Sequence, residues 1–443
     1  MVQVSTSIPA RTPIAALAQH IGARVRVCGL VEAVRDQKRM QFVVLADASG
    51  QVQITHEKSG QADPLAEQIA ALTPGSAVAV IGRVASAPGV RLGGLEIVAG
   101  AAELHSLAAA PLPIAPDSAL EKQIDWRAIS LRRPDQRLVF RVQTTLEAAM
   151  RDWWLARGFI EIHSPKLMGT FSESGAEAFK VAYFGDRAAY LAQSPQFYKQ
   201  MAMAAGFERV FEIGPAFRAE PSFTPRHETE FTSLDMEVAW TADHTELMAL
   251  EEAWLAHAIA RVAEVHGEEI RELLGVEVAV PTTPFPKVTL AEALGIVRAS
   301  GHTPAKSDDL DPEGERRLCA HIARETGHGF VFVTDYPASA RAFYHRRRED
   351  RPDLTQSFDL LWNGLEITTG AQREHRYEVL RAQALERGYA LEPLQPYLDF
   401  FRYGCPPHGG MGVGLARVLM AMLGRSSVRE TTLISRTPTR LLP

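Results

Sequence analysis

The chain has 443 residues, of which 46% are hydrophobic and 23% charged, and its formal charge at pH 7 is −6. This composition is typical of a globular protein of two or three domains, and the acidic balance excludes nucleic-acid binding by overall basicity, so any such binding must be local. Cys28, Cys319 and Cys405 lie far apart, which indicates a reducing compartment and no cysteine metal site. The chain has no apolar run long enough to cross a membrane and does not open on a signal-peptide pattern, so a cytoplasmic protein with no membrane partner is expected.

The first hundred residues have the pattern of short strands separated by turns. Strands are expected at residues 25–31, 41–46, 52–55, 77–84 and 95–98, with one helical stretch at 64–72. Five strands and a helix in so short a segment predict a small β-barrel of the OB type. An Ala- and Pro-rich stretch follows, so we expect a barrel domain at 1–103, a linker at 104–134 and a larger domain at 135–443.

Three side chains on neighbouring barrel strands form a candidate surface for single-stranded nucleic acid. Arg35 supplies a cation, Phe42 an aromatic ring and Gln53 an amide. These groups can contact a phosphate, stack on a base and read a base edge. Taken alone, Phe42 is more often part of a barrel core.

The larger domain begins with a helix that starts at Pro134 and ends at Gly158. Its apolar residues repeat every four positions and form one stripe: Leu138, Val142, Leu146, Met150 and Trp154. This periodicity fits both a domain core and a subunit interface. A strand at 159–162 follows, and the later strand pairs and helices do not form regular βαβ units, which favours an α+β fold on an antiparallel sheet.

A strongly charged hairpin is expected between residues 209 and 240. In its second strand two faces alternate, one with Leu234, Met236, Val238 and Trp240 and the other with Ser233, Asp235 and Glu237. The segment before that strand carries charges of both signs: Arg218, Glu220, Arg226, His227 and Glu228. Arginine matches phosphate by its fork geometry, so a bound polyphosphate is the preferred interpretation. The alternative is an exposed strand with ordinary surface ion pairs.

The Asn-Gly pair at 363–364 is a strong signal for a two-residue type I′ hairpin turn. Such a turn would place Asp359 opposite Thr368 and would leave Asp359 and Glu366 on one face of the sheet. Two carboxylates in this arrangement can hold Mg²⁺ together with phosphate oxygens, or they can belong to a polar face closed by Arg373. Arg373 itself is either a structural ion-pair partner or a ligand for a substrate carboxylate.

Near the C-terminus, Gly409–Gly414 leads into an apolar helical stretch that contains Arg417. Glycines before a helix let a nucleotide approach the backbone, but the segment lacks the lysine of a P-loop and the context of a dinucleotide-binding motif. Arg417 is therefore its most informative residue. Two other segments, 172–177 and 193–199, place polar groups and Lys199 on expected loops, where singly they are more often ordinary loop residues.

Taken together, these motifs resemble those of class II aminoacyl-tRNA synthetases, and specifically of the aspartyl-tRNA synthetases of archaeal-like architecture. The resemblance extends over nearly the whole chain. It rests on the long helix before Pro165, the hairpin around Arg218 and Arg226, and the glycine-rich entry to the last helix. Segments similar to the aspartate branch in particular are Gln193–Lys199, Phe358–Asp359, Gly364–Gly370, Gln372–Arg376 and Tyr403–Gly410.

The resemblance implies which residues bind ATP and Mg²⁺. Arg218 would contact the α-phosphate and stabilise its developing charge, with Arg417 and Glu220 as further catalytic residues. The whole ATP site would comprise Arg218, Glu220, Arg226, His227, Glu366, Gly414 and Arg417, and the metal site would comprise Asp359 and Glu366. A strong general base is not needed, because positioning and charge stabilisation can supply the rate.

The same resemblance implies the remaining substrates and partners. L-aspartate would be bound by Glu173, Gln196, Lys199, Asp235, Thr369 and Arg373. The aspartyl-adenylate would react with the 3′ end of tRNA(Asp), and tRNA(Asn) is left open as a second acceptor. Arg35, Phe42 and Gln53 fall at the family's anticodon-contact positions, and the class implies a homodimer.

Three positions depart from the family pattern. Ala416 stands where a glutamate usually precedes the last arginine, Ile434–Thr437 replaces a Phe-Pro-Arg-Asp tail, and Leu30 replaces a tryptophan. These departures motivate one alternative, a paralogue that activates aspartate for a biosynthetic pathway outside translation. Another alternative, an RNA-binding protein on an inactive scaffold, is disfavoured because Arg218 and Arg417 are retained.

Overall fold

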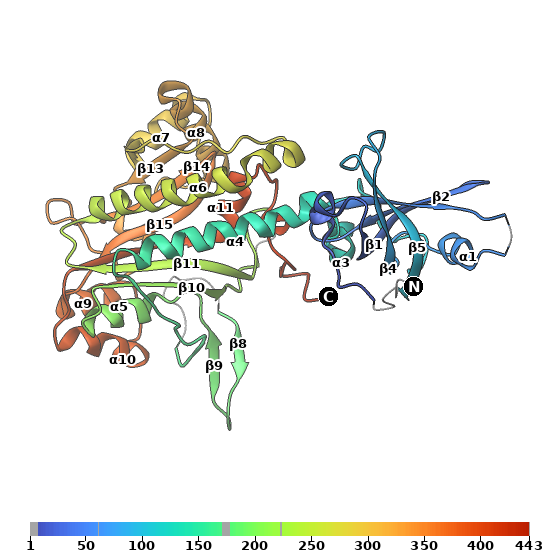
Figure 1. Cartoon of the computed structure of the whole chain (residues 1–443). Coiled ribbons are helices and arrows are strands. Elements are labelled where there is room, and N and C mark those ends of the chain that lie inside the picture. Colours follow the sequence, from blue (N-terminus) through green and yellow to red (C-terminus); the bar gives the residue numbers. More distant parts are fainter. Residues whose placement is uncertain (1–7, 61, 171–177, 222–223, 443) are drawn as a thin grey trace. The chain divides into compact units, whose positions relative to one another are not determined.

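The structure is a computed structural model that describes residues 8–60, 62–170, 178–221 and 224–442. The chain divides into two compact units, Met1–Ser118 and Ala119–Pro443. Each unit has its own hydrophobic core, and Figure 1 labels the helices and strands of both.

The first unit is a closed five-stranded barrel with the strand order β1-β2-β3-β5-β4. Its elements are η1 (Ile14–His20), β1 (Arg24–Asp36), β2 (Met40–Ala46), β3 (Gln51–Glu57), α1 (Pro64–Ala70), β4 (Ala77–Ser86) and β5 (Leu95–Ser106). Strands β3 and β5 pair in parallel, and the other neighbours pair antiparallel. Inward-facing Val27, Leu45, Ile54 and Ile97 are completely buried. The prediction of an OB-type barrel is confirmed.

The fifth barrel strand is longer than the sequence indicates. Strand β5 continues beyond Val98 to Ser106, and its second half pairs with β4, where Ser106 lies opposite Ala77. Small residues at 100–102 carry no alternation of polarity, so the strand pattern is lost there although the ladder continues. Residues 104–106, expected in the linker, are therefore strand.

The second unit is built on an eight-stranded sheet with the order β12-β13-β14-β15-β16-β11-β10-β6. In that order the strands are Lys287–Thr289, Phe330–Thr334, Ser357–Trp362, Leu365–Arg373, His408–Gly414, Glu230–Ala239, Arg209–Phe217 and Ile160–Glu161. The pairs β12–β13 and β10–β6 are parallel and the other pairs are antiparallel. An antiparallel core of an α+β fold was predicted and is confirmed.

Helices flank this sheet, and two long ones, α4 and α6, run side by side along it (Figure 1). The helices are α2 (Leu120–Asp125), α3 (Arg127–Ser130), α4 (Pro134–Leu155), α5 (Gln196–Ala204), α6 (His244–Leu274), α7 (Leu290–Ala299), α8 (Pro312–Thr326), η2 (Ala338–Ala340), α9 (Tyr377–Glu386), α10 (Leu391–Arg402), α11 (Leu415–Met422) and η3 (Val428–Glu430). A small separate sheet contains β7 (Leu167–Met168), β9 (Ala188–Leu191) and β8 (Lys180–Ala182).

The apolar stripe of α4 belongs to the core of the chain itself. Leu138, Val142 and Leu146 are completely buried within this single chain. Trp154 packs on Phe211 of β10 and on Trp254 of α6, with ring centroids 4.8 and 5.5 Å apart. The stripe therefore carries no information about a subunit interface.

The charged hairpin forms as expected except at its end. Strands β10 and β11 pair from Arg209–Val238 to Phe217–Glu230. Trp240 does not continue the apolar face, because β11 ends at Ala239 and Trp240 has a φ of 64° with 68% of its surface exposed. The prediction for this residue was wrong: the chain leaves the sheet there towards α6.

The Asn-Gly turn is confirmed, with φ of 51° at Asn363 and 84° at Gly364. The predicted register is correct next to the turn but not beyond it, because a β-bulge intervenes between Leu360 and Leu361. Asp359 consequently lies opposite Thr369 and not opposite Thr368. A bulge adds one residue to one strand, and hydrophobic alternation alone does not reveal it.

Candidate active site

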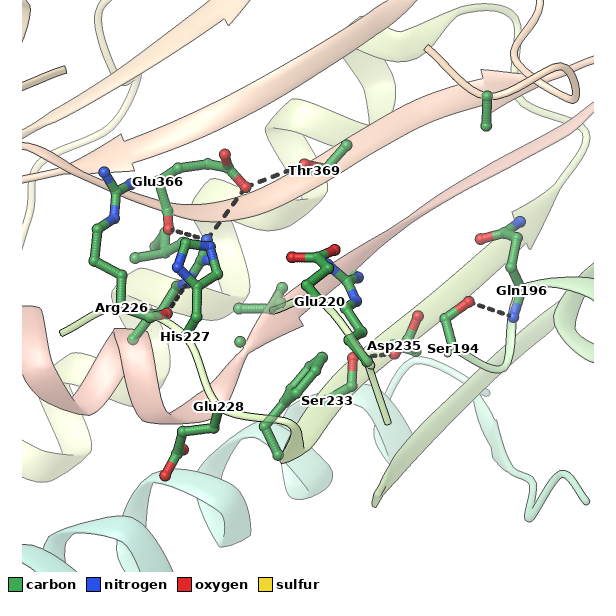
Figure 2. Close-up of a pocket in the computed structure, with 18 of the residues that line it drawn as sticks. Ser194, Gln196, Glu220, Arg226, His227, Glu228, Ser233, Asp235, Glu366 and Thr369 are labelled. Atoms are coloured by element: carbon green, nitrogen blue, oxygen red, sulfur yellow. Dashed lines mark hydrogen bonds and ion pairs between the residues drawn. The ribbon is translucent and has the colours of Figure 1, made fainter. Parts of the chain in front are cut away.

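One cavity of about 730 Å³ lies over the middle strands of the eight-stranded sheet. Its wall comes from the β10–β11 hairpin, β15, β16 and the start of α11, together with loops around residues 306–309 and 340–345. Figure 2 shows ten labelled side chains of this wall. Predicted site residues that line it are Gln196, Arg218, Glu220, Arg226, His227, Asp235, Glu366, Thr369, Arg373, Gly414 and Arg417.

Three arginines from separate segments meet at one end of the cavity, which we call the phosphate end. Arg417, in the first turn of α11, donates from Nη1 to the Glu366 carbonyl at 3.0 Å and from Nε to the Arg226 carbonyl at 3.3 Å. The Arg218 guanidinium lies 5.3 Å from the Phe231 ring centre, and its buried Nε has no hydrogen-bond partner among the described residues. Three cations directed at one cavity suit a ligand with several negative charges.

The neighbouring ionisable groups at this end are shifted by burial. Burial, reinforced by Arg417, lowers the pKa of His227 to about 4, so its imidazole is neutral at pH 7. Burial raises the pKa of Glu228 to about 7, although the Thr432 hydroxyl donates to its carboxylate at 2.8 Å. Both shifts follow from desolvation, which disfavours the charged form of either group.

The two carboxylates predicted to hold Mg²⁺ have different surroundings. Glu366 lines the cavity and accepts from the Thr369 hydroxyl at 3.4 Å. Asp359 is 4% exposed, and its Oδ2 accepts from Arg341 Nη2 at 2.6 Å. The other oxygen, Oδ1, is buried without a hydrogen-bond partner in the described part of the chain. The described residues contain no group of three or more metal-ligating side chains.

At the opposite end, which we call the aspartate end after the ligand expected there from the sequence, ion pairs form a closed network. Lys199 Nζ lies 2.8 Å from Asp235 Oδ1 and 3.4 Å from Glu237 Oε2. Arg373 donates to Glu237 Oε1 at 3.0 Å, to Gln196 Oε1 at 3.1 Å and to the Gly410 carbonyl at 3.0 Å. Neither cation is more than 3% exposed.

Lys199 lies behind Asp235 and does not line the cavity. Its predicted place on a loop was wrong, because both Gln196 and Lys199 belong to helix α5. The Ser-Pro before the helix suggests a loop, but the chain becomes helical immediately after it. Lys199 therefore acts on the cavity through Asp235, whereas Arg373 borders the cavity itself.

Sequence reasoning missed several residues that shape the site. Glu237 was noted only as a polar position on its strand, yet it lies between Lys199 and Arg373. Glu315 and Arg341, in contact with Arg226 and Asp359, come from segments without a recognisable motif. Only the alternation that puts Glu237 on the face of Asp235 was a usable signal.

The glycines before α11 serve close packing of strands. They belong to β16, and a side-chain carbon on Gly410 would collide with the Met236 carbonyl of β11. One on Gly412 would lie 3.2 Å from Asp235 Oδ1. Glycine is therefore required at position 410, where β16 lies beside β11 in the sheet and has no space for a side chain next to the Met236 carbonyl and the Glu237 carboxylate.

In the barrel unit, the three predicted nucleic-acid contacts lie on adjacent strands. Arg35 of β1 pairs directly with Phe42 of β2, and Gln53 of β3 pairs with Val44 further along. Arg35 is exposed and Phe42 half-buried, so the ring is not part of the barrel core. Gln53 donates to Glu96 at 3.3 Å. The predicted aspartate ligand Glu173 lies outside the described residues.

An antiparallel sheet with arginines over its centre, together with a barrel of the OB type that commonly binds oligonucleotides, is what a synthetase that acts on tRNA requires. Comparison with known families gives the same class. Residues 119–438 match the model of the tRNA synthetases class II (D, K and N), and residues 25–104 match that of the OB-fold nucleic acid binding domain. The chain belongs to the class II tRNA synthetase (D, K and N) family.

Curated relatives and solved structures extend the comparison. The chain is 40% identical to an aspartate–tRNA(Asp/Asn) ligase of Aeropyrum pernix, over 97% of this chain and 98% of the relative. It is 39% identical to an aspartate–tRNA(Asp) ligase of Pyrococcus furiosus, over 95% and 97%. Asparaginyl-tRNA synthetase from Pyrococcus horikoshii, complexed with asparaginyl-adenylate, superposes with a TM-score of 0.89 at 32% identity, over 98% of this chain and all of that one. The described part of the chain has no helix long and apolar enough to cross a membrane.

Proposed function

We propose that this protein is an aspartate–tRNA ligase, which activates L-aspartate with ATP and transfers it to the 3′ end of tRNA(Asp). The observation that carries the proposal is a single cavity with three arginines at one end and Arg373 at the other. Near-full-length similarity to aspartate–tRNA ligases supports it. Similarity that includes the barrel disfavours the alternative of a paralogue outside translation.

In this proposal, ATP lies along the phosphate end. Arg218 contacts the α-phosphate, where its unpartnered Nε indicates capacity for an additional acceptor. Arg226 and Arg417 hold the outer phosphates, and Glu220, His227 and Gly414 border the nucleotide. The aspartate α-carboxylate attacks the α-phosphorus, and pyrophosphate leaves from the opposite side. His227 is neutral and removes no proton, because the attacking carboxylate is already ionised.

L-aspartate lies at the aspartate end in this proposal. Its side-chain carboxylate faces Arg373, which Glu237 and Gln196 hold in orientation. Its ammonium group faces Asp235, and Thr369 borders the same space. Because the buried network already balances two cations with two anions, aspartate binding changes the pairing of Arg373 without leaving a new charge uncompensated.

We further propose that Mg²⁺ binds at Asp359 and Glu366 together with ATP. Carboxylate oxygens are the ligands that Mg²⁺ prefers, and the buried Asp359 Oδ1 has no partner within the described residues. The ion would neutralise phosphate charge. Arg341 already balances the other Asp359 oxygen, so Glu366 supplies the carboxylate that faces the cavity.

Aspartate-dependent exchange of pyrophosphate into ATP tests the main proposal. We expect exchange with aspartate and much weaker exchange with asparagine, because Arg373 presents a cation to the substrate side chain. The absence of exchange with any amino acid at saturating ATP would refute the proposal.

The choice of tRNA is a separate proposal. The curated relatives are named for tRNA(Asp) alone or for both tRNA(Asp) and tRNA(Asn), and we propose that this enzyme charges both. The barrel, with Arg35, Phe42 and Gln53 as anticodon contacts, is the domain that would read the difference. Aspartylation of the two purified tRNAs should proceed at comparable kcat/KM, and a preference of more than about 100-fold for tRNA(Asp) would contradict it.

We also propose a homodimer. The stripe of α4 gives no support for it, but strand β6 is a short edge of the sheet. Ile160 of this strand, Leu155 at the end of α4 and Phe207 before β10 are 40–50% exposed. An exposed apolar edge suits a second copy of the chain. Light scattering after size exclusion should give twice the chain mass, and a monomer at micromolar concentration would exclude a stable dimer.

A further inference from the structure

Glu315 of helix α8 contacts two parts of the phosphate end at once. Both of its oxygens accept from Arg226 Nη2, at 2.8 and 2.5 Å. Its Oε2 also accepts from the backbone N–H of Glu366 at 3.0 Å. The two side chains of the ion pair are only 13% and 7% exposed. Glu315 thus joins α8 to β15 and to the loop that carries Arg226.

The packing of α8 fixes this contact. The helix begins at Pro312 after Asp311, which accepts from the Gly314 N–H at 2.8 Å and caps the helix. A side-chain carbon on Gly364 would lie 3.0 Å from the Arg316 Cα, so the start of α8 lies directly against the β14–β15 turn. Glu315 is therefore held in place by two neighbouring elements before any ligand is bound.

These contacts complete a closed ring around the phosphate end. Glu315 holds the Arg226 side chain and the Glu366 N–H, while Arg417 holds the carbonyls of Arg226 and Glu366. Arg226 and Arg417 are thereby positioned relative to each other through the Glu315 carboxylate and the backbone of one residue, Glu366. Glu315 binds one terminal nitrogen of Arg226, Nη2, and within the described part of the chain the other, Nη1, has no hydrogen-bond acceptor and can receive an anion.

From this geometry we propose that Glu315 is a positioning residue for ATP, which holds Arg226 in the orientation that receives the outer phosphates. The inference rests on the proposed function of this cavity as an ATP site. An arginine that is already ordered loses less conformational freedom on binding phosphate, so Glu315 contributes to ATP affinity without touching ATP. Its effect should be confined to ATP, because the residues of the aspartate end do not contact it.

The test compares Glu315→Ala, Glu315→Gln and Glu313→Ala. Glu313 is the matched control: it lies on the same helix, but its carboxylate pairs with Arg316 and Arg317 at the surface. We expect the ATP KM in pyrophosphate exchange to rise about tenfold in Glu315→Ala, with an unchanged KM for aspartate. The KM for ATP should rise less in Glu315→Gln, because a glutamine can still accept from the Glu366 N–H. In Glu313→Ala it should equal that of the wild type.

A double-mutant cycle separates positioning from mere structural support. If Glu315 acts through Arg226, then Glu315→Ala should add little to the effect of Arg226→Ala on ATP affinity. Calorimetric titration of ATP into each folded variant gives the same comparison without turnover. Additive effects, an unchanged ATP affinity in Glu315→Ala, or equal increases in KM for ATP and aspartate would each overturn the inference. Wild-type exchange decides the proposed function independently of these variants.

Discussion

The cations at the two ends of the cavity are held differently. At the aspartate end every cation has a buried anionic partner, whereas at the phosphate end Arg226 pairs with Glu315 but Arg218 has no such partner among the described residues. Lys199 and Arg373 share Glu237, and all three side chains are at most 3% exposed. Arg218, in contrast, forms no ion pair with a described residue, and Arg417 is held mainly by backbone carbonyls. The comparison teaches that the aspartate end is ordered entirely by its own charges, while the phosphate end keeps one cation, Arg218, for the charge of a ligand.

Removing a charge at the aspartate end should therefore lower the stability of the fold. Glu237→Gln leaves two buried cations with only Asp235 to balance them, and such a loss costs about 3–5 kcal/mol. Urea unfolding at pH 7 should show this decrease, while Glu230→Gln, at the exposed start of the same strand, should leave stability unchanged. Equal stability of Glu237→Gln and wild type would show that Lys199 and Arg373 do not depend on the charge of Glu237.

Removing a charge at the phosphate end should lower activity and leave the stability of the fold unchanged. Arg218→Ala deletes the cation assigned to the α-phosphate, and the loss of one such group typically costs about 10²–10³-fold in kcat. Pyrophosphate exchange measures the effect and thermal unfolding monitors the fold. Arg209→Ala is the control, because Arg209 begins strand β10, which ends one residue before Arg218. A large drop in melting temperature for Arg218→Ala would contradict the difference between the two ends.

Glu251 extends the comparison, because it is a buried acid whose carboxylate has no hydrogen-bond partner among the described residues. Burial raises the pKa of Glu251, in α6, from 4.5 in the unfolded chain to about 8. The folded state then holds a proton that the unfolded state has released, so the wild type loses stability as pH rises from about 4.5 to about 8. Glu251→Gln should remove this loss, and its advantage should reach about 4 kcal/mol at pH 8 and vanish near pH 4.

Urea unfolding at several pH values measures the effect of Glu251. Glu252→Gln is a useful control, since Glu252 is adjacent in sequence but only partly buried. If the unfolding free energies of wild type and Glu251→Gln changed with pH in parallel, the Glu251 carboxyl would have an ordinary pKa in the folded state, and this prediction would be wrong.

Sequence patterns were sufficient for features that depend on neighbouring residues. The barrel strands, the charged hairpin and the Asn363–Gly364 turn follow from alternation and turn chemistry, and each is present. The bulge near Leu361 was missed because every residue of β14 is buried and those around the bulge are all apolar, so the strand has no alternation of polarity there that an extra residue could interrupt. The end of β11 was missed because Trp240 fits the alternation although the backbone turns there.

For the site, sequence identified the residues that face the cavity better than those that hold them. Arg218, Arg417 and Arg373 were named in advance and line it. Glu315 and Arg341 were not, because their contacts join segments far apart in the chain and neither lies in a motif. Supporting residues of this kind are visible only once the tertiary fold brings the segments together.

Strand β16 has a consequence for the length of the chain. The Gly410 carbonyl holds Arg373 at the aspartate end, and seven positions later Arg417 reaches the phosphate end. The glycine backbone between them is pressed against β11, so it has no room to bulge. In the proposed complex, this stretch therefore fixes the distance between the residues that would bind aspartate and those that would bind ATP. Substitutions elsewhere can be absorbed, but inserting or deleting a single residue here would misalign the two substrates.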